Sequence, residues 1–406
     1  MSFSILPAPI VKAVTELGYT VPTAIQAQAI PLILSGKDII GQSQTGSGKT
    51  AAFGLPMLAK MTPGKLQGLI LTPTRELCIQ VSDALRGFAK YTKLRVTAVF
   101  GGVGLGPQIQ ATRSADVIVA TPGRLLDLME RGLRLGTVTH LVLDEADRML
   151  DMGFIDDVER IIQRVPKQRQ TMLFSATLSP RLQSLVHKHM NSPVTIQTQI
   201  RVDKSFLNEK LYSVEMHDKF SLLVHLLKHE KHGIALVFCR TRHGCDRVAK
   251  RLHAQQLDAT AIHGGLAQNK RTRAIENLHH HGLGILVATD VASRGLHIDN
   301  IYHVYNYDIP GTPDDYVHRI GRTARAGAKG EAVTFVSSQE ARDFRSILRT
   351  VKRDIPVTPT PKFERIALPP SQFKPGFNRS QDKPFHKPAQ GSRPFWKKKR
   401  NFGGQR

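Results

Sequence analysis

Cysteines, acidic residues and long apolar runs are all scarce in this sequence. The three cysteines, Cys78, Cys239 and Cys245, include no CxxC pair, which excludes a disulfide framework and argues against a four-ligand structural zinc site. No apolar run approaches the ~20 residues that a membrane helix needs, and the first residues lack the pattern of a secretory signal. We therefore expect a soluble protein of a reducing, cytoplasmic compartment with no membrane partner.

Basic residues, in contrast, are abundant. The 406 residues contain 57 Lys and Arg against 33 Asp and Glu, which gives a formal net charge of +24. Apolar residues make up 41% of the chain, enough for packed cores, and the length predicts two or three domains. The charge predicts a polyanionic partner, and nucleic acid is favoured over an anionic membrane surface.

The C-terminal stretch, residues 369–406, has a composition of its own. It contains six prolines and ten Lys and Arg against one Asp, without a periodic apolar pattern, so we expect disorder. Its aromatic rings alternate with cations, and rings can stack on unpaired bases while cations pair with phosphates. The stretch therefore predicts an RNA-binding tail, with a purely solubilising tail as the alternative.

Short apolar runs alternate with helical patterns through the body of the chain. Near-continuous apolar strands are typical of parallel sheets buried on both faces, and their alternation with helices predicts an α/β fold. The series breaks in a polar stretch at 198–208, where we expect a linker between domains. The runs occupy residues 69–71, 117–119, 141–143, 172–174, 235–238, 285–287 and 332–335.

A glycine-rich segment, residues 43–50, lies between an expected strand end and a helical pattern. Glycines let backbone N–H groups wrap phosphates, so the spacing predicts a phosphate-binding loop. We expect Lys49 to reach the β- and γ-phosphates of ATP and the Thr50 hydroxyl to hold Mg²⁺. The predicted nucleotide contacts are Ser43 (where the general pattern has glycine), Gln44, Thr45, Gly46, Ser47, Gly48, Lys49 and Thr50.

An acidic segment, residues 144–147, directly follows an apolar run. The carboxyl ends of parallel strands are where α/β sheets bind ligands. Asp144 is predicted to hold Mg²⁺, and Glu145 to orient and deprotonate the attacking water. The alternative is an acidic cap at a helix N-terminus.

A basic segment, residues 318–325, lies in the second half, which has no phosphate-binding loop of its own. Arg322 and Arg325 are three residues apart, so on a helix they share a face. We predict that both act as arginine fingers on a nucleotide held by the first half. The alternative is a solvated basic helix face.

Together these segments resemble the DEAD-box RNA helicases of superfamily two, in a prokaryotic form with a short basic C-terminal tail. Further motif matches are spread in the family's order over residues 1–350. The resemblance implies two tandem RecA-like domains with parallel sheets flanked by helices, followed by a disordered basic tail. The expected parts are a first domain at 1–200, a linker at 201–208, a second domain at 209–355 and an aromatic-containing, RNA-binding tail at 356–406.

The resemblance also implies roles around the nucleotide. Gln26 is expected to read the adenine edge, Phe3 and Tyr19 to belong to the ATP site, and Asp290 to align the interface arginines. The family couples its nucleotide site to unwinding through residues that correspond here to Asp147, Ser175, Thr177, His318 and Arg319.

RNA contacts are implied in both domains, mainly to backbone phosphates and hence independent of base sequence. His297 stands where the family usually has an Asp near the ribose. The implied RNA contacts are Pro73, Thr74, Arg75, Gly102, Thr121, Pro122, Gly123, Arg124, Gly265, Gln268, Arg271 and Thr289.

The predicted function is that of an ATP-dependent RNA helicase with Mg²⁺ as cofactor. RNA-stimulated ATP hydrolysis is expected to drive domain closure, local duplex unwinding and remodelling of RNA–protein complexes. Two alternatives stay open: an RNA clamp that ATP locks in place, and a DNA helicase. Ribosomal or RNA-decay complexes are candidate partners.

Overall fold

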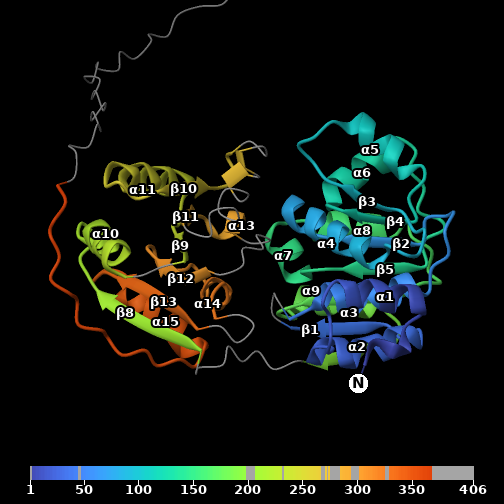
Figure 1. The fold of residues 1–406 in the computed structure, drawn as a ribbon, viewed down its shortest axis with the longest axis horizontal. Helices are drawn as coiled ribbons and strands as arrows, with labels where there is room; N and C mark the ends of the chain where they lie inside the picture. Colours follow the sequence, from blue (N-terminus) through green and yellow to red (C-terminus); the bar gives the residue numbers. More distant parts are fainter. Residues whose placement is uncertain are drawn as a thin grey trace, which may run out of the picture. The chain divides into compact units, whose positions relative to one another are not determined.

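The computed structural model describes residues 2–43, 47–197, 206–230, 233–266, 270, 271, 273, 274, 284–293, 301–324 and 329–367. Met1–Arg365 form one unit and Ile366–Arg406 a second. The first unit contains two parallel β-sheets, each flanked by helices (Figure 1). This is the predicted pair of RecA-like α/β folds. Within the described residues, no helix is long and apolar enough to cross a membrane.

The first sheet has seven parallel strands in the order β3-β4-β2-β5-β6-β1-β7. Consecutive strand residues point to opposite faces, so Ile70 packs in one core cluster while its neighbours Leu69 and Leu71 pack in the other. The strands are β1 (Ile39–Gln42), β2 (Gly68–Leu71), β3 (Val96–Val99), β4 (Val117–Ala120), β5 (His140–Leu143), β6 (Gln170–Ser175) and β7 (Val194–Gln197).

Helices cover both faces of this sheet because both faces are apolar. Residues of α1 to α4 join one core cluster, and residues of α6, α8 and α9 join the other. The helices are η1 (Phe3–Ile5), α1 (Ala8–Glu16), α2 (Ala24–Leu34), α3 (Lys49–Ala59), α4 (Arg75–Phe88), α5 (Leu105–Thr112), α6 (Pro122–Glu130), α7 (Ala146–Asp151), α8 (Ile155–Ile162) and α9 (Pro180–His189).

The second sheet has six parallel strands in the order β10-β11-β9-β12-β13-β8. Its strands are β8 (Leu207–Ser213), β9 (Ile234–Phe238), β10 (Ala259–Ile262), β11 (Gly284–Ala288), β12 (Ile301–Asn306) and β13 (Gly330–Val336). Its described helices are α10 (Lys219–His229), α11 (Arg242–Ala254), α13 (Asp290–Ser293), α14 (Pro313–Ile320) and α15 (Ala341–Thr350).

Two backbone pairings lie close to the predicted boundaries of the second domain. β8 begins at Leu207, inside the predicted linker, because Leu207 is buried and pairs with Gly330 of β13. The predicted tail begins at 356, yet Val357 forms a β-bridge with Leu211 and the Thr358 N–H donates to the Leu211 carbonyl at 2.7 Å. An edge strand offers such unpaired backbone groups. Residues 368–406 lie outside the described part of the chain.

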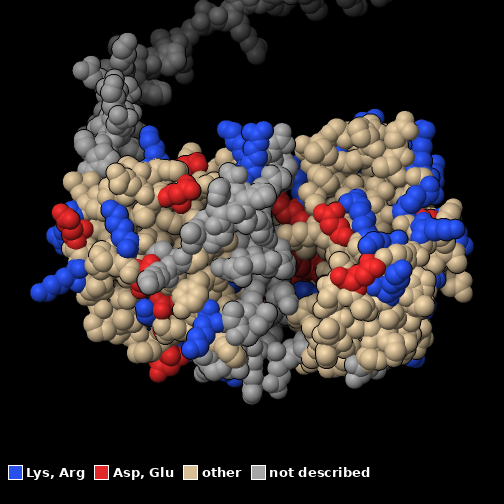
Figure 2. Space-filling view, in the orientation of Figure 1, with Lys and Arg blue, Asp and Glu red and all other residues tan. Residues whose placement is uncertain are grey.

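Because all strands of a sheet run parallel, their carboxyl ends lie along one side of the sheet and their amino ends along the opposite side. We call these two sides the carboxyl edge and the amino edge. The segments after β1, β2, β4, β5 and β6, which hold the predicted site residues, all lie at the carboxyl edge of the first sheet. The opposite, amino edge is rich in cations, and Figure 2 shows Lys and Arg gathered along the margin of this domain near β2 and β4. The two edges therefore differ in chemistry.

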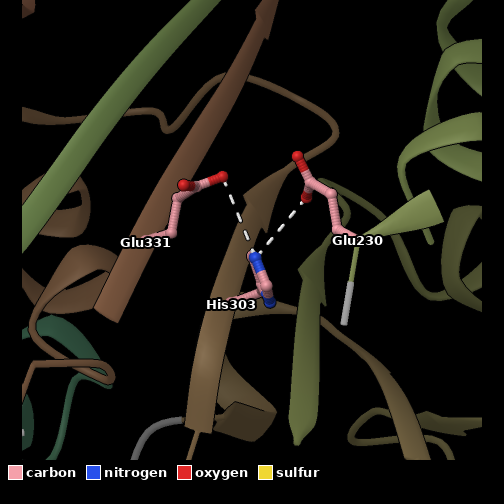
Figure 3. Close-up of side chains that lie close together, drawn as sticks. All are labelled: Glu230, His303 and Glu331. Carbon is pink, nitrogen blue, oxygen red and sulfur yellow. Dashed lines mark ion pairs between the residues drawn. The ribbon is translucent and has the colours of Figure 1, made fainter. Parts of the chain in front are cut away.

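A network of charged side chains, formed by Lys210, Glu230, His303 and Glu331, lies at the amino edge of the second sheet. Figure 3 shows His303 pointing between two carboxylates, with Nε2 3.4 Å from Glu230 Oε2 and 3.8 Å from Glu331 Oε1. The grouping has the donor types of a metal site. However, the Lys210 ammonium lies 2.7 Å from Glu331 Oε1 and 3.5 Å from Glu230 Oε1. Because Lys210 already supplies a cation to both carboxylates, we assign this cluster to stabilising the fold.

The buried His140 makes the first domain sensitive to acid. Burial lowers its pKa to about 4, with Lys60 adding to the effect. A folded-state pKa below the unfolded value favours the neutral ring, so this contribution to stability is present above pH 6.5 and is lost as the pH falls toward 4. We expect the His140→Gln variant to lose about 2 kcal/mol less stability than the wild type between pH 7 and pH 4.5.

Urea unfolding at the two pH values measures this difference. The exposed His253, substituted as His253→Gln, provides the matched control and is expected to behave as the wild type. The same pH dependence in all three proteins would show that His140 is not the sensor.

Candidate active site

The predicted phosphate-binding loop, residues 43–50 and called the nucleotide loop below, extends from the end of β1 to the first turn of α3. Gly48 has φ +90°, and a Cβ there would clash with Gln26 Nε2, so only glycine fits. Lys49 opens α3, is 8% exposed, and donates from Nζ to the Ser43 carbonyl at 3.3 Å. The helix N-terminus and the ammonium together favour a bound phosphate. Three predicted contacts, Gln44, Thr45 and Gly46, lie outside the described residues.

Gln26 supports the nucleotide loop from α2. Its Oε1 accepts the Thr23 N–H at 3.0 Å, and its Nε2 donates to the Gly48 carbonyl at 3.1 Å. Thr23 Oγ1 donates to the Ser47 carbonyl at 2.8 Å. Both ends of the Gln26 amide are therefore used within the protein, and a contact with adenine stays a prediction.

The aromatic rings predicted for the ATP site lie together. Phe3 is 6% exposed and packs in the core, and its ring meets Tyr19 edge-on with centroids 6.5 Å apart. Tyr19 is 37% exposed, so it presents the more open ring of the two. Their contact with a nucleotide base stays a prediction.

Three buried acidic side chains follow β5. Asp144, Glu145 and Asp147 are 2%, 5% and 9% exposed. Glu145 has φ +52°, an uncommon conformation that is often found at functional sites, and its carboxylate forms an ion pair with the buried Arg148. Burial alone would raise the pKa of Glu145, but Arg148 and Lys49 outweigh burial and hold that pKa below its ordinary value.

Arg148 is a site residue that the sequence analysis did not single out. Its position three residues after Glu145, the spacing at which helical side chains meet, is the signal that could have identified it.

Asp144 has the properties of a ligand for a metal ion. Burial raises its pKa to about 6, against the opposing charge of Lys49, and its Oδ1 has no hydrogen-bond partner among the described residues. A buried carboxylate oxygen without a partner is unfavourable, and Mg²⁺ takes oxygen ligands. Thr50 lies in the first turn of α3, next to Lys49. These donors fit the predicted Mg²⁺.

Asp147 connects the acidic segment to the end of β6. Its Oδ2 accepts the N–H groups of Ala176 at 2.9 Å and Thr177 at 3.1 Å. In return, its own N–H donates to Ser175 Oγ at 3.2 Å, and that hydroxyl donates to the Thr177 carbonyl at 2.7 Å. These bonds hold the acidic segment against the end of β6, and a role in coupling stays a prediction.

Removing the charge of Asp147 tests this connection. We expect Asp147→Asn to destabilise the fold by about 1–3 kcal/mol, since an amide cannot replace two bonds that a buried carboxylate accepts. Asp83→Asn is the control, because Asp83 pairs with Arg86 at the surface and should change stability by less than about 1 kcal/mol. Urea unfolding measures both, and equal effects would mean that Asp147 holds nothing in place.

Arg319 organises the basic segment of the second domain. It is 2% exposed and binds Asp290 with two hydrogen bonds, Nε to Oδ1 at 2.6 Å and Nη2 to Oδ2 at 2.8 Å. Its Nη1 donates to the Asp308 carbonyl at 2.6 Å. These bonds fix α14 against the ends of β11 and β12. The role of Asp290 in aligning the interface arginines stays a prediction.

One pocket is lined by residues of both domains. Arg322, which is 4% exposed, and the partly buried His318 add positive charge that helps to lower the pKa of Glu145. Arg325 lies outside the described residues. The pocket is lined by Lys49, Glu145, Asp147, Arg148 and Ala176 of the first domain and by Val317, His318, Gly321 and Arg322 of the second.

The predicted RNA contacts of the first domain gather at the carboxyl ends of β2, β3 and β4. Thr74 caps α4 with its hydroxyl, and Arg75 follows as the first helical residue. The Arg75 guanidinium lies against Gly102, which has φ +83° and no room for a Cβ. Arg124 donates from Nη1 to a loop carbonyl at 3.1 Å. The other predicted residues at this edge are Pro73, Thr121, Pro122 and Gly123.

The second domain places its predicted RNA contacts after β10 and β11. The Gly265 N–H donates to His263 Nδ1 at 3.2 Å, and Thr289 is 8% exposed. Arg271 Nη2 lies 3.0 Å from Glu76 Oε1, so a phosphate would have to replace Glu76. Gln268 and His297 lie outside the described residues.

Fold and site together define a nucleotide-binding protein with two parallel α/β domains. The family model "DEAD/DEAH box helicase" matches residues 23–185, and "Helicase conserved C-terminal domain" matches residues 218–327. The DEAD-box ATP-dependent RNA helicase CshA of Bacillus subtilis is 43% identical over 353 residues, 86% of this chain and 72% of the relative. CshA of Geobacillus kaustophilus is 44% identical over 90% of this chain and 77% of the relative.

Solved structures agree with these matches. Dbp5 of S. cerevisiae bound to RNA and ADP BeF3 has a TM-score of 0.79 and 31% identity over 87% of this chain and 94% of that chain. Mss116p bound to ssRNA and AMP-PNP has a TM-score of 0.77 and 27% identity over 87% and 77%. The chain belongs to the DEAD-box helicase family.

Proposed function

We propose that this chain is an ATP-dependent RNA helicase whose ATPase activity is stimulated by RNA. The observation that supports this most is the pocket in which Lys49 and Glu145 of the first domain and Arg322 of the second line one space. A phosphate-binding lysine, a carboxylate base and an arginine finger are the parts that ATP hydrolysis needs.

The first domain prepares the hydrolysis. Lys49 binds the β- and γ-phosphates, and Glu145 takes the proton of the attacking water, since a lowered pKa keeps its carboxylate ionised at neutral pH. Arg148 holds that carboxylate in position through their ion pair. Asp144 and Thr50 would hold Mg²⁺, which neutralises phosphate charge when bound.

The second domain completes the site. Arg322, with Arg325, stabilises the charge that develops on the γ-phosphate. ATP can drive domain closure only by binding the closed state more tightly than the open one, and contacts from Arg322 provide this difference. Asp147 passes the change to Ser175 and Thr177 through its hydrogen bonds.

RNA is the proposed polyanion. The relatives are named as RNA helicases, and solved relatives are bound to RNA with a nucleotide analogue. Arg75 and Arg124 offer contacts to phosphates, so we expect little base specificity. Closure would hold one strand in a form that a duplex cannot keep, which separates strands locally and remodels RNA–protein complexes. Ribosomal or RNA-decay partners and a cytoplasmic location stay predictions.

Substitution of Glu145 tests whether the protein hydrolyses ATP as an enzyme or uses ATP only as an RNA clamp. We expect Glu145→Gln to lower the kcat for ATP by about 10²–10⁴-fold while RNA binding in the presence of ATP persists. Glu215→Gln, at an exposed glutamate, is the control and should leave kcat unchanged. Multiple-turnover hydrolysis that survives Glu145→Gln would contradict the assignment of the base.

The same assay tests the choice of nucleic acid. Phosphate release is followed without nucleic acid, with single-stranded RNA, and with DNA of the same base sequence. Stimulation by RNA alone supports the proposal, whereas equal stimulation by DNA would favour a DNA helicase. ATP binding without hydrolysis under any condition would favour a clamp.

A further inference from the structure

A second basic surface lies at the amino edge of the first sheet, on the side opposite to the nucleotide loop. A groove of about 470 Å³ there is lined by five cations and no carboxylate. An adjoining groove of about 690 Å³ shares Leu133 and Arg134 with it and adds two cations and one carboxylate, Glu130. We call this continuous surface the amino-edge groove. Its seven cations are Lys65, Arg95, Arg113, Arg131, Arg134, Arg160 and Arg164.

Few of these cations are neutralised within the described residues. Arg160 pairs with Asp157 at 3.3 Å, and Arg95 lies 3.8 Å from Asp116. Asp116 is fully buried, and its two oxygens accept the N–H groups of Gly64 at 2.6 Å and Arg95 at 2.8 Å. The other five cations have no ion pair with the described residues and are all exposed.

Helix ends explain part of this charge, but not most of it. Arg113 and Arg131 directly follow α5 and α6, and Arg164 lies just beyond α8. Each helix C-terminus has about half a negative charge, so three of them offset about 1.5 charges. The lining side chains sum to about +6, and Asp116 and Asp157, which pair with Arg95 and Arg160, lower this to about +4. A surplus of more than two charges is left after the helix ends are counted.

We propose that the amino-edge groove binds the sugar–phosphate backbone of RNA that extends beyond the helicase cleft. No aromatic ring lines either part of the groove, so contacts come from cations and phosphates, not from stacked bases. Such binding is independent of base sequence and depends on salt. The inference rests on the proposed function only in taking RNA as the polyanion. The first domain then contacts RNA at both edges of its sheet. Because only long RNA reaches both edges, long RNA binds more tightly than short RNA.

The test removes three cations of the groove. The variant is Arg113→Gln, Arg131→Gln and Arg134→Gln combined. Affinity is measured against salt for single-stranded RNA of about 10 nucleotides, within the size of one binding groove, and of about 40 nucleotides. For the longer RNA, the negative slope of log K against log salt should be shallower by about 2 in the triple variant than in the wild type. Each lost phosphate contact removes about 0.7 from the steepness of this slope. The shorter RNA should bind and stimulate ATPase as with the wild type.

The matched control loses the same charge elsewhere. Arg342→Gln, Arg345→Gln and Arg349→Gln combined changes three exposed arginines of α15 and should leave the slope unchanged. The single variant Arg134→Gln, at the residue shared by both parts of the groove, should lower the slope by about 0.7 and serves if the triple variant does not fold.

Equal slopes for the wild type and the groove variants would overturn the proposal, as would equal losses in the control. A poly-glutamate peptide is tested as a second polyanion. If the groove variants bind RNA as the wild type does but lose binding of this peptide, the groove is assigned to an acidic protein instead. Wild-type protein that binds no RNA of either length would overturn the proposed function and the groove together. If the wild type binds the short RNA and only the change predicted for the long RNA is missing, the groove proposal alone is overturned.

Discussion

The burial of three carboxylates at the end of one strand is the constraint on which the rest of the site depends. Taking an ion out of water costs several kcal/mol unless partners replace the water. Asp147 has backbone N–H groups and Glu145 has Arg148, whereas Asp144 keeps an oxygen without a hydrogen-bond partner. The unequal compensation is reflected in opposite pKa shifts of two neighbours, Asp144 and Glu145. We expect a bound nucleotide with its metal ion to supply the partner that Asp144 lacks among the described residues.

Parallel topology distributes the chemistry of the first domain over two edges. Strand ends and helix N-termini meet at the carboxyl edge, where the acidic segment, the predicted phosphate-binding loop and the predicted RNA contacts gather. Helix C-termini meet at the opposite edge and attract cations, which the amino-edge groove then holds in excess. The predicted catalytic site and the proposed second RNA-binding surface therefore lie at opposite edges of one sheet.

Much of this could be predicted from the sequence, because each motif is local. The apolar runs at 69–71, 141–143 and 172–174 all lie in strands, and the acidic segment follows β5 as expected. The edge strand β8 was not predicted because its polar residues break the apolar run. Contacts between distant segments were also out of reach: the Gln26 amide bonded to Gly48, and groove cations spread from residue 65 to residue 164.

We infer that one active site is divided between two domains, which ATP and RNA bring together. All three native cysteines are buried, so cysteines introduced by Lys37→Cys and Lys228→Cys, both at exposed positions, can be labelled selectively with a fluorescent donor and acceptor. Energy transfer between the two domains is then measured with ATP, with RNA and with both. A change in transfer that requires both ligands is the predicted result. The same transfer under all conditions would contradict a divided site.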